Sequence, residues 1–412
     1  MSRIADSTDA ADQRRAQPRF TRGPVTWLCY WMLGYFAFLQ AVLGPLMPFI
    51  RSDLKLSYTV ASLHFSAFAL GAVLMGTASD RITRRWGRQT SFWGGGAGMA
   101  VGAALLMLSP VVIGTILGSL LMGALGNLLL VTLQAALADG HGPSSVVALT
   151  EANVMASAFA ILAAVSVGAL TGLGLGWRLV IPPAIVMLAL VAVRFRATAI
   201  PQPRPVRQRA EGHATRPPRL PLRYWIFWLV IILETGVEWC VAYWGASFLT
   251  AYTRLRASDA ATAMGAFFLA MLIGRYGGSR LSRVIAGQTV LLIALAVGLL
   301  GFPLFWLAPF APLRLVGLFV VGLGLANVYP VGVALATNEA PGQADQATAR
   351  LAVAGGVAVL LAPLALGALS DAVGIGHAFA VAMPLLLLAL LAAFLAIRTP
   401  TTDVTTQARG TR

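Results

Sequence analysis

Two glutamates inside a long apolar stretch, "ILETGVEWCVAYWGASFL", are the strongest candidates for chemistry in this sequence. Glu234 and Glu238 are four positions apart, so they share one face of a helix. A charged acid near the centre of a bilayer costs about 2.5–3.5 kcal/mol, and two neighbouring acids also repel each other. A carboxyl so placed can take up and release a proton, so we predict a proton-carrying role for Glu238, with Glu234 second. The alternative is a protonated or hydrogen-bonded glutamic acid that only holds helices together.

Aromatic and amide side chains form the second group of candidates. Trp239, Tyr243 and Trp244 offer aromatic faces of the kind that line sites for small organic solutes, although packing or an interfacial aromatic belt would use the same residues. Buried amides need partners, and a polar solute could supply them to four further side chains expected near mid-depth: Gln40, Asn127, Asn327 and Tyr329. His64 is expected to be structural, and Arg275 is expected to extend to the membrane surface rather than bind an anion.

The composition shows what kind of element must position these side chains. Of 412 residues, 58% are hydrophobic and 11% are charged, with a mean hydropathy of +0.79. Soluble domains carry about 25% charged residues, which excludes a water-soluble globule. Because a bilayer takes about 20 apolar residues per helix, the pattern predicts an all-α polytopic protein with twelve spans: 24–49, 57–79, 89–109, 111–138, 149–173, 176–197, 222–252, 258–279, 284–307, 310–337, 346–370 and 373–398.

The basic residues give the chain its orientation. The net charge of +15 comes from arginines in short connectors, which favours contact with the lipid bilayer over binding of nucleic acid. Most of them fall on one side of the predicted helices, so both termini are expected in the cytoplasm of a bacterial-type cell, with the chain in its cytoplasmic membrane. Cys29 and Cys240 lie in apolar segments without CxxC spacing, so we expect no disulfide and no metal site. We also expect no cofactor. The expected coupling ion is a proton.

The long polar break divides the chain into two halves. The predicted organisation is a disordered cytoplasmic tail over 1–23, a six-helix bundle over 24–197, a basic linker over 198–221, a second six-helix bundle over 222–398 and a cytoplasmic tail over 399–412. A shift of 199 positions superimposes several features of the two halves. Among them are Phe68 on Phe267, Gly123 on Gly322 and Gly168 on Gly367. Six helices is an even number, so the two copies enter the membrane the same way round, and a binding site is expected between them near mid-depth.

The connector "GTASDRITRRWGRQ" places one acid and four arginines between two apolar helices. Its "G…DR…GR" pattern resembles the loop signature of the major facilitator superfamily. "GWR" at 176–178, "GLGLANVYP" at 322–330 and "GALSDAVG" at 367–374 agree with that resemblance. The resemblance runs from about residue 24 to 398 and implies a twelve-helix transporter that works by alternating access. The loop residues that carry it are Gly76, Asp80, Arg81, Arg84, Arg85, Gly87 and Arg88.

In that family the acid of this loop braces the start of the eleventh helix and closes the cytoplasmic side. The resemblance and the 199-residue shift together suggest two pairs between the halves: Asp80 with Arg350, and Glu151 with Arg280 or Arg283. Such pairs would form when the protein faces outward and part when it opens inward. Plain surface solvation of these charges is the alternative.

We therefore expect a secondary transporter, not an enzyme, that moves a small organic solute, functions as a monomer and takes up its solute with protons. "GPLMPFI" and "GVEW…YW…FL" resemble permeases of the sugar and organic-solute branch. A proton-coupled drug or metabolite efflux antiporter is the alternative. It is weakened by Ser119, where drug exporters of the superfamily carry an arginine, and by Ala169 after Gly168, where they carry a proline. A receptor that does not transport would be expected to lose the acids that this chain keeps.

Overall fold

The computed structural model of the chain describes residues 20–202 and 220–399, and every regular element in those ranges is a helix. The predictions for the tails, 1–23 and 399–412, and for the linker, 198–221, fall mostly outside the described residues.

Few residues in the turns between the described helices take a positive φ. Gly176 and Gly374, 198 positions apart, both take positive φ values, 81° and 83°, directly before the sixth and twelfth spans. Glycine adopts this conformation without steric cost, so the repeat extends to the turns.

The first bundle consists of six spans. Its helices are α2 (Pro24–Ala41) continued by α3 (Leu43–Leu54), α4 (Tyr58–Trp86), α5 (Arg88–Leu108), α6 (Val112–His141), α7 (Ser145–Gly172) and α8 (Pro182–Arg194). The second bundle repeats this order with α9 (Leu222–Tyr252), α10 (Ala257–Leu281), α11 (Gly287–Leu307), α12 (Ala311–Leu325) continued by α13 (Val328–Asn338), α14 (Ala344–Val373), and α15 (Ile375–Ala378) followed by α16 (Ala382–Arg398). Short 3₁₀ turns connect some of them: η1 (Gly142–Ser144), η2 (Trp177–Val180) and η3 (Phe379–Val381).

Length decides how many times the chain crosses the membrane. The described residues contain 11 candidate spans, and one of these, Val112–Gly172, is 61 residues long. At 1.5 Å per residue it would extend about 90 Å, three times the thickness of a bilayer core. It contains both α6 and α7, which η1 separates at Pro143. The fold therefore has twelve spans, as predicted from the sequence.

The two bundles are built alike down to single glycines. A Cβ at Gly123 in α6 would overlap the carbonyl oxygen of Phe68 in α4, and one at Gly322 in α12 would lie 2.8 Å from the carbonyl oxygen of Phe267 in α10. Both contacts bring two helices of one bundle together at a point where only glycine fits. The prediction of two pseudo-symmetric six-helix bundles is confirmed, and the 199-residue shift is the step between them.

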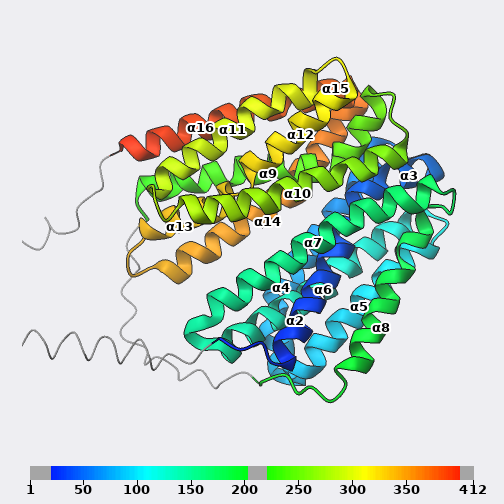
Figure 1. Ribbon diagram of the computed structural model, residues 1–412, viewed down its shortest axis with the longest axis vertical. Coiled ribbons are helices and arrows are strands. Elements are labelled where there is room, and N and C mark those ends of the chain that lie inside the picture. Colours follow the sequence, from blue (N-terminus) through cyan, green and yellow to red (C-terminus); the bar gives the residue numbers. More distant parts are fainter. Residues whose placement is uncertain (1–19, 203–219, 400–412) are drawn as a thin grey trace, which may run out of the picture.

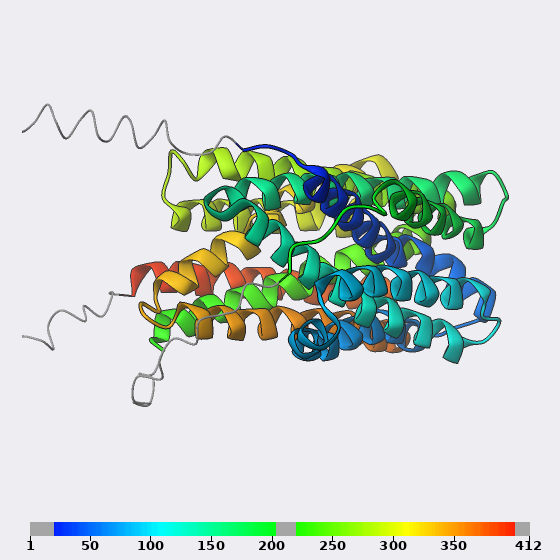
Figure 2. The same ribbon diagram turned by 90° about the horizontal axis from the view of Figure 1, so that it is seen from below.

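The same symmetry governs how the bundles meet. A Cβ at Gly168 in α7 would lie 2.5 Å from the carbonyl oxygen of Ser258 in α10, and one at Gly367 in α14 would lie 2.8 Å from that of Tyr58 in α4. Two equivalent seams, α7 with α10 and α14 with α4, therefore join the bundles. In Figure 1 the bundles lie side by side and diverge toward the end that carries the starts of α7 and α14, and in Figure 2 the first bundle lies in front of the second. We call this end the basic end, and the end that carries the close of α3 the opposite end.

Candidate functional site

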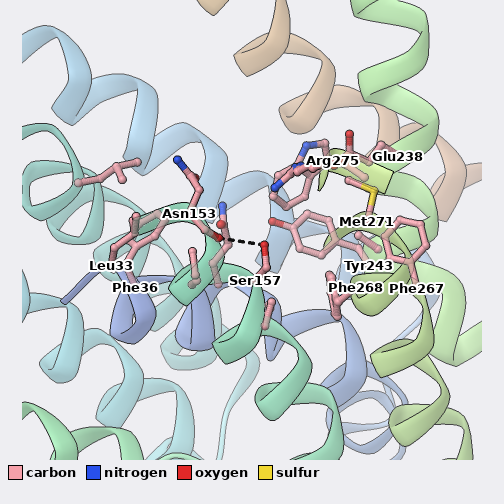
Figure 3. A pocket seen from close by; sticks show the side chains of 18 of the residues that line it. Leu33, Phe36, Asn153, Ser157, Glu238, Tyr243, Phe267, Phe268, Met271 and Arg275 are labelled. Atoms are coloured by element: carbon pink, nitrogen blue, oxygen red, sulfur yellow. Dashed lines mark hydrogen bonds between the residues drawn. The ribbon is translucent and has the colours of Figure 1, made fainter. Parts of the chain in front are cut away.

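A cavity of about 270 Å³ lies between the two bundles. It is lined by α2, α6 and α7 of the first bundle and by α9 and α10 of the second (Figure 3). Its polar lining residues are Gln40, Gln134, Asn153, Ser157, Glu238 and Arg275, and its aromatic ones are Phe36, Trp239, Tyr243, Phe267 and Phe268. This is the central location between duplicated halves that the repeat predicts.

The two acids lie on α9, Glu234 behind the cavity wall and Glu238 in it. Glu238 is partly exposed and lines the cavity, whereas Glu234, one turn earlier, is fully buried. Neither carboxylate oxygen of Glu234 has a hydrogen-bond partner in the part of the chain that the structure describes. A buried, unpaired carboxylate is costly in its charged form. Only Glu238 of the two can exchange a proton directly with the cavity.

Arg275, on α10, lies next to Glu238 at one side of the cavity (Figure 3). The sequence suggested that its side chain would extend to the membrane surface, but the structure includes it in the cavity lining. It is the only cation that lines the cavity among the described residues, and it lies within Coulombic range of both glutamates. The second bundle therefore supplies one positive and one acidic side chain to the same wall.

The first bundle supplies a wall that is polar but uncharged. Gln40 comes from α2, Gln134 from α6, and Asn153 and Ser157 from α7. Ser157 donates a hydrogen bond of 3.0 Å to the carbonyl oxygen of Asn153, which is dashed in Figure 3. The amide of Asn153 donates one of 2.8 Å to the carbonyl oxygen of Leu149. Of these residues only Gln40 was predicted.

Aromatic rings close the cavity toward the opposite end. Tyr243, which lines the cavity, stacks on Phe65 of α4 with centroids 4.1 Å apart and planes only 2° from parallel. Trp244 meets the same Phe65 edge-on at 5.3 Å and donates a 3.0 Å hydrogen bond to the carbonyl oxygen of Pro363 in α14. Predicted as a cavity residue, Trp244 is fully buried in this seal and does not line the cavity. The seal joins α4 of one bundle to α9 and α14 of the other.

Two predicted cavity amides hold helices of the same bundle together instead. Asn127 donates a 3.0 Å hydrogen bond to the carbonyl oxygen of Ala72, and Asn327 donates one of 2.7 Å to that of Gly274. The two bonds occupy equivalent places, α6 to α4 and the α12–α13 break to α10. Tyr329 follows this break on α13, is 37% exposed and does not line the cavity. These three residues were predicted from their depth in the membrane, but depth does not determine which helix a side chain faces. They therefore lie outside the lining.

An acidic clamp at the opposite end was not predicted. Asp371, near the end of α14, accepts hydrogen bonds from the backbone nitrogens of Tyr58 at 2.7 Å and Thr59 at 2.8 Å, and from the Thr59 hydroxyl at 2.6 Å. These donors begin α4 of the other bundle, and the first turn of a helix has unsatisfied N–H groups that favour an acid. The clamp thus fastens the opposite end across the seam between α14 and α4.

Within the part of the chain that the structure describes, no such link joins the bundles at the basic end. All six ion pairs among the described residues join side chains of one bundle. Asp80 pairs with Arg84 on the exposed end of α4, an arrangement that contributes little free energy, while Arg350 lies over the ring of Trp225. The predicted pair of Asp80 with Arg350 is therefore not formed in this conformation.

Glu151 is also held within its own bundle. It accepts two hydrogen bonds from Arg22, at 2.8 and 2.6 Å, and one of 2.9 Å from the hydroxyl of Tyr30. Arg280 instead donates to the hydroxyl of Tyr276 at 2.9 Å, and Arg283 lies exposed after the end of α10. The cross-bundle pairs were expected only when the basic end is closed, so for that state they remain predictions.

The rest of the connector is structural. Arg88 is buried at the start of α5 and bonds to Asp139 at 2.8 Å and to the carbonyl oxygen of Pro201 at 2.8 Å. Gly87 has a φ of 81° between α4 and α5, which explains the glycine there. Gly76 faces the amide of Asn127, and the side chains of Arg81 and Arg85 lie on the surface.

Comparison with known proteins first concerns the fold and then identifies the family. The fold matches crystal structures of membrane transporters, although at 15–17% identity the likeness concerns the fold alone. A variant of the nucleoside transporter NupG matches with a TM-score of 0.74 at 15% identity over 91% of this chain and 99% of that one. A bacterial homologue of the human lysosomal transporter Spinster, in an inward-facing and occupied conformation, matches with a TM-score of 0.70 at 17% identity over 91% and 97%.

The family itself is established by sequence. The Major Facilitator Superfamily matches residues 26–313 and 228–412, so this chain belongs to that superfamily and is an MFS-type transporter rather than an enzyme. It is also 23% identical over 381 residues, 91% of this chain and 96% of the relative, to an uncharacterised MFS-type transporter of Yersinia pestis. The subfamily and the substrate follow from neither match.

Proposed function

We propose that this transporter takes up a small organic solute across the cytoplasmic membrane together with a proton, and that Glu238 carries the proton. The observation behind the proposal is the position of Glu238, which is the only acid that lines the central cavity among the described residues. The cavity of about 270 Å³ lies just below the usual range of 300–1,000 Å³ for sites of drug-sized ligands, which favours a small solute.

We infer the orientation from the positive charges. Arg81, Arg84 and Arg85 lie at the basic end, and cytoplasmic connectors of membrane proteins are enriched in arginine and lysine. With the basic end in the cytoplasm, both termini are cytoplasmic. The conformation, closed by the aromatic seal and the Asp371 clamp at the opposite end, then faces inward.

Arg275 gives the proton step a physical basis. When Glu238 is charged, Arg275 beside it offsets the charge within the cavity. When Glu238 takes a proton, Arg275 becomes the uncompensated charge on that wall and is available to a solute. The cavity with protonated Glu238 thus carries one more positive charge than the cavity with charged Glu238. This difference links binding of the proton to binding of the solute.

The first experiment identifies a ligand for the purified protein by thermal shift, since a bound ligand raises the melting temperature by mass action. The panel contains sugars, organic acids, amino acids and cationic drugs. Nucleosides are added because one solved structure of this fold is that of a nucleoside transporter, and peptides because another, with a TM-score of 0.69 at 16% identity over 92% of this chain and 96% of that one, is the peptide transporter POT.

The second experiment measures transport of that ligand in proteoliposomes that contain the Glu238→Gln variant. We expect uptake driven by a pH gradient to fall to background, while counterflow exchange of the ligand persists. Asp259→Asn is the control, because Asp259 is a partly exposed acid at the opposite end whose one ion pair among the described residues is with Arg256. Unchanged accumulation in Glu238→Gln would refute the role of Glu238. Accumulation driven only by a gradient of the opposite direction would favour the efflux antiporter.

A further inference from the structure

A second cavity, of about 600 Å³, lies outside the transport pathway on the first bundle. It is a groove between α2 and α8, and it shares no lining residue with the central cavity. Nine residues form it: Arg22, Pro24, Trp27 and Trp31 at the start of the chain's first span, and Met187, Leu190, Val191, Arg194 and Phe195 at the end of the sixth.

Its charges gather at one end. Arg22 lies two residues before the start of α2, and Arg194 is the last residue of α8, so both guanidinium groups mark the basic end of the groove. No acid lines it. Glu151 neutralises Arg22 in part, since they form an ion pair of 2.6 Å, whereas Arg194 contacts the ring of Phe195 as a cation on an aromatic face.

The remainder of the groove is apolar and open. On α8, Leu190 and Met187 lie one and two turns beyond Arg194, which places apolar surface about 10 Å deep below the charge. On α2, Trp27 and Trp31 do the same from the other wall. Leu190 is 65% exposed and Trp27 is 42% exposed. In a chain that crosses the membrane twelve times, these side chains face acyl chains, and tryptophan is typical of the level of the headgroups.

From this arrangement we infer that the groove binds one anionic phospholipid, with its phosphate at Arg194 and Arg22 and an acyl chain against Trp27, Trp31 and Leu190. The charge complementarity selects an anionic headgroup, because basic pockets between helices at the cytoplasmic surface attract anionic lipids. The apolar length of the groove selects a lipid over a free phosphate. The lipid stabilises the contact between α2 and α8 without entering the central cavity.

The test is native mass spectrometry of the full chain in detergent with phosphatidylglycerol, phosphatidylethanolamine or phosphatidylcholine of identical acyl chains. We expect one phosphatidylglycerol to be retained in preference to the other two lipids. Arg194→Gln should weaken its binding about fivefold, as expected for one arginine at a charged lipid surface. Inorganic phosphate at the same concentration should not displace it.

The matched control is Arg398→Gln. Arg398 is the last residue of α16, is exposed at the same end of the other bundle, and also lies over an aromatic ring, that of Phe394. Arg22→Gln is a second variant, so that misfolding of one does not decide the outcome, and melting curves of each variant show whether the fold is kept. Equal retention of the three lipids would overturn the inference. An equal loss of lipid binding in Arg194→Gln and Arg398→Gln would also overturn it, as would displacement of the lipid by inorganic phosphate. Lipid binding that appears only after residues 1–19 are removed would show that these residues, and not a lipid, fill the groove.

Discussion

The Asp371 clamp makes a sharp prediction about the conformational equilibrium. Its three hydrogen bonds to Tyr58 and Thr59 cross from one bundle to the other, so they exist only while the opposite end is closed. An acid or polar side chain that caps a helix contributes about 0.5–2 kcal/mol, and an acid at a helix N-terminus about 0.3–1 kcal/mol. Asp371 lies at the surface, so we take about 1–2 kcal/mol for the whole clamp.

Removing the clamp should therefore open the opposite end. Asp371→Ala loses every acceptor and should shift the ratio of outward-open to inward-open molecules about 5- to 30-fold, because 1.4 kcal/mol is a factor of ten. Asp371→Asn keeps one acceptor oxygen but loses the charge and should lie between Asp371→Ala and the parent protein.

Distance measurement by electron–electron resonance can follow this shift. Spin labels at Leu175→Cys and Arg254→Cys, both exposed and on different bundles at the opposite end, should separate as that end opens. The native Cys29 and Cys240 are buried, so labelling of the introduced positions is favoured. Asp259→Asn is again the control, because this acid at the start of α10 bonds only within its own helix end. The reasoning fails if Asp371→Ala leaves the distance distribution unchanged, or if Asp259→Asn changes it as much.

Two further predictions concern packing and the basic end. Gly123→Ala should destabilise the protein by about 1–3 kcal/mol, because the added methyl overlaps the backbone of α4. Gly140→Ala is the control, because open space surrounds Gly140, and it should not lower the melting temperature in detergent. Similar melting temperatures for the two variants would contradict the close-packing argument. Arg22→Gln should release Glu151 from its ion pair and favour closure of the basic end, by up to about 1 kcal/mol because the pair is partly exposed. Slower labelling of Ser157→Cys in the cavity would show this closure, and faster labelling would contradict it.

The sequence predicted the spans well because hydropathy and helix length depend on the bilayer, which is the same along the whole chain. It predicted helix ends less well. The span 57–79 continues as α4 to Trp86, since the charged connector remains helical and Asp80 pairs with Arg84 one turn on. The span 310–337 is divided after Leu325, where Asn327 bonds across to α10. Hydropathy marks where a chain leaves the membrane, not where its backbone hydrogen bonds stop.

The cavity was predicted only in part, for a related reason. Glu238, Gln40, Trp239 and Tyr243 were found from their types and depth. Gln134 was missed although it lies seven residues after Asn127 on α6, close to the same helical face. Asn127 faces α4, to which it bonds, whereas Gln134 reaches the cavity. Periodicity shows which residues share a face of a helix. Which neighbouring helix covers each part of that face depends on the angle at which the helices cross, and the sequence pattern of one helix does not encode this angle.

The symmetry of the scaffold separates residues that build the fold from residues that do chemistry. The close glycine contacts, the bond made by Asn127 or Asn327 and the seam between the bundles each occur twice. The charged groups of the central cavity and of the clamp do not repeat.

The positions 199 residues before Glu234, Glu238 and Arg275 hold Tyr35, Leu39 and Gly76, so the first bundle has no counterpart for any of them. The position 199 residues before Asp371 holds Gly172, which leaves the seam between α7 and α10 without a clamp. The first bundle thus lines the cavity with neutral polar side chains, and the second lines it with Glu238, the proposed proton carrier, beside Arg275. In the proposed mechanism these two walls move relative to each other, so the protonation state of Glu238 can bias which state of the cavity is favoured. The proposed coupling therefore has its origin in the positions at which the duplicated halves have diverged.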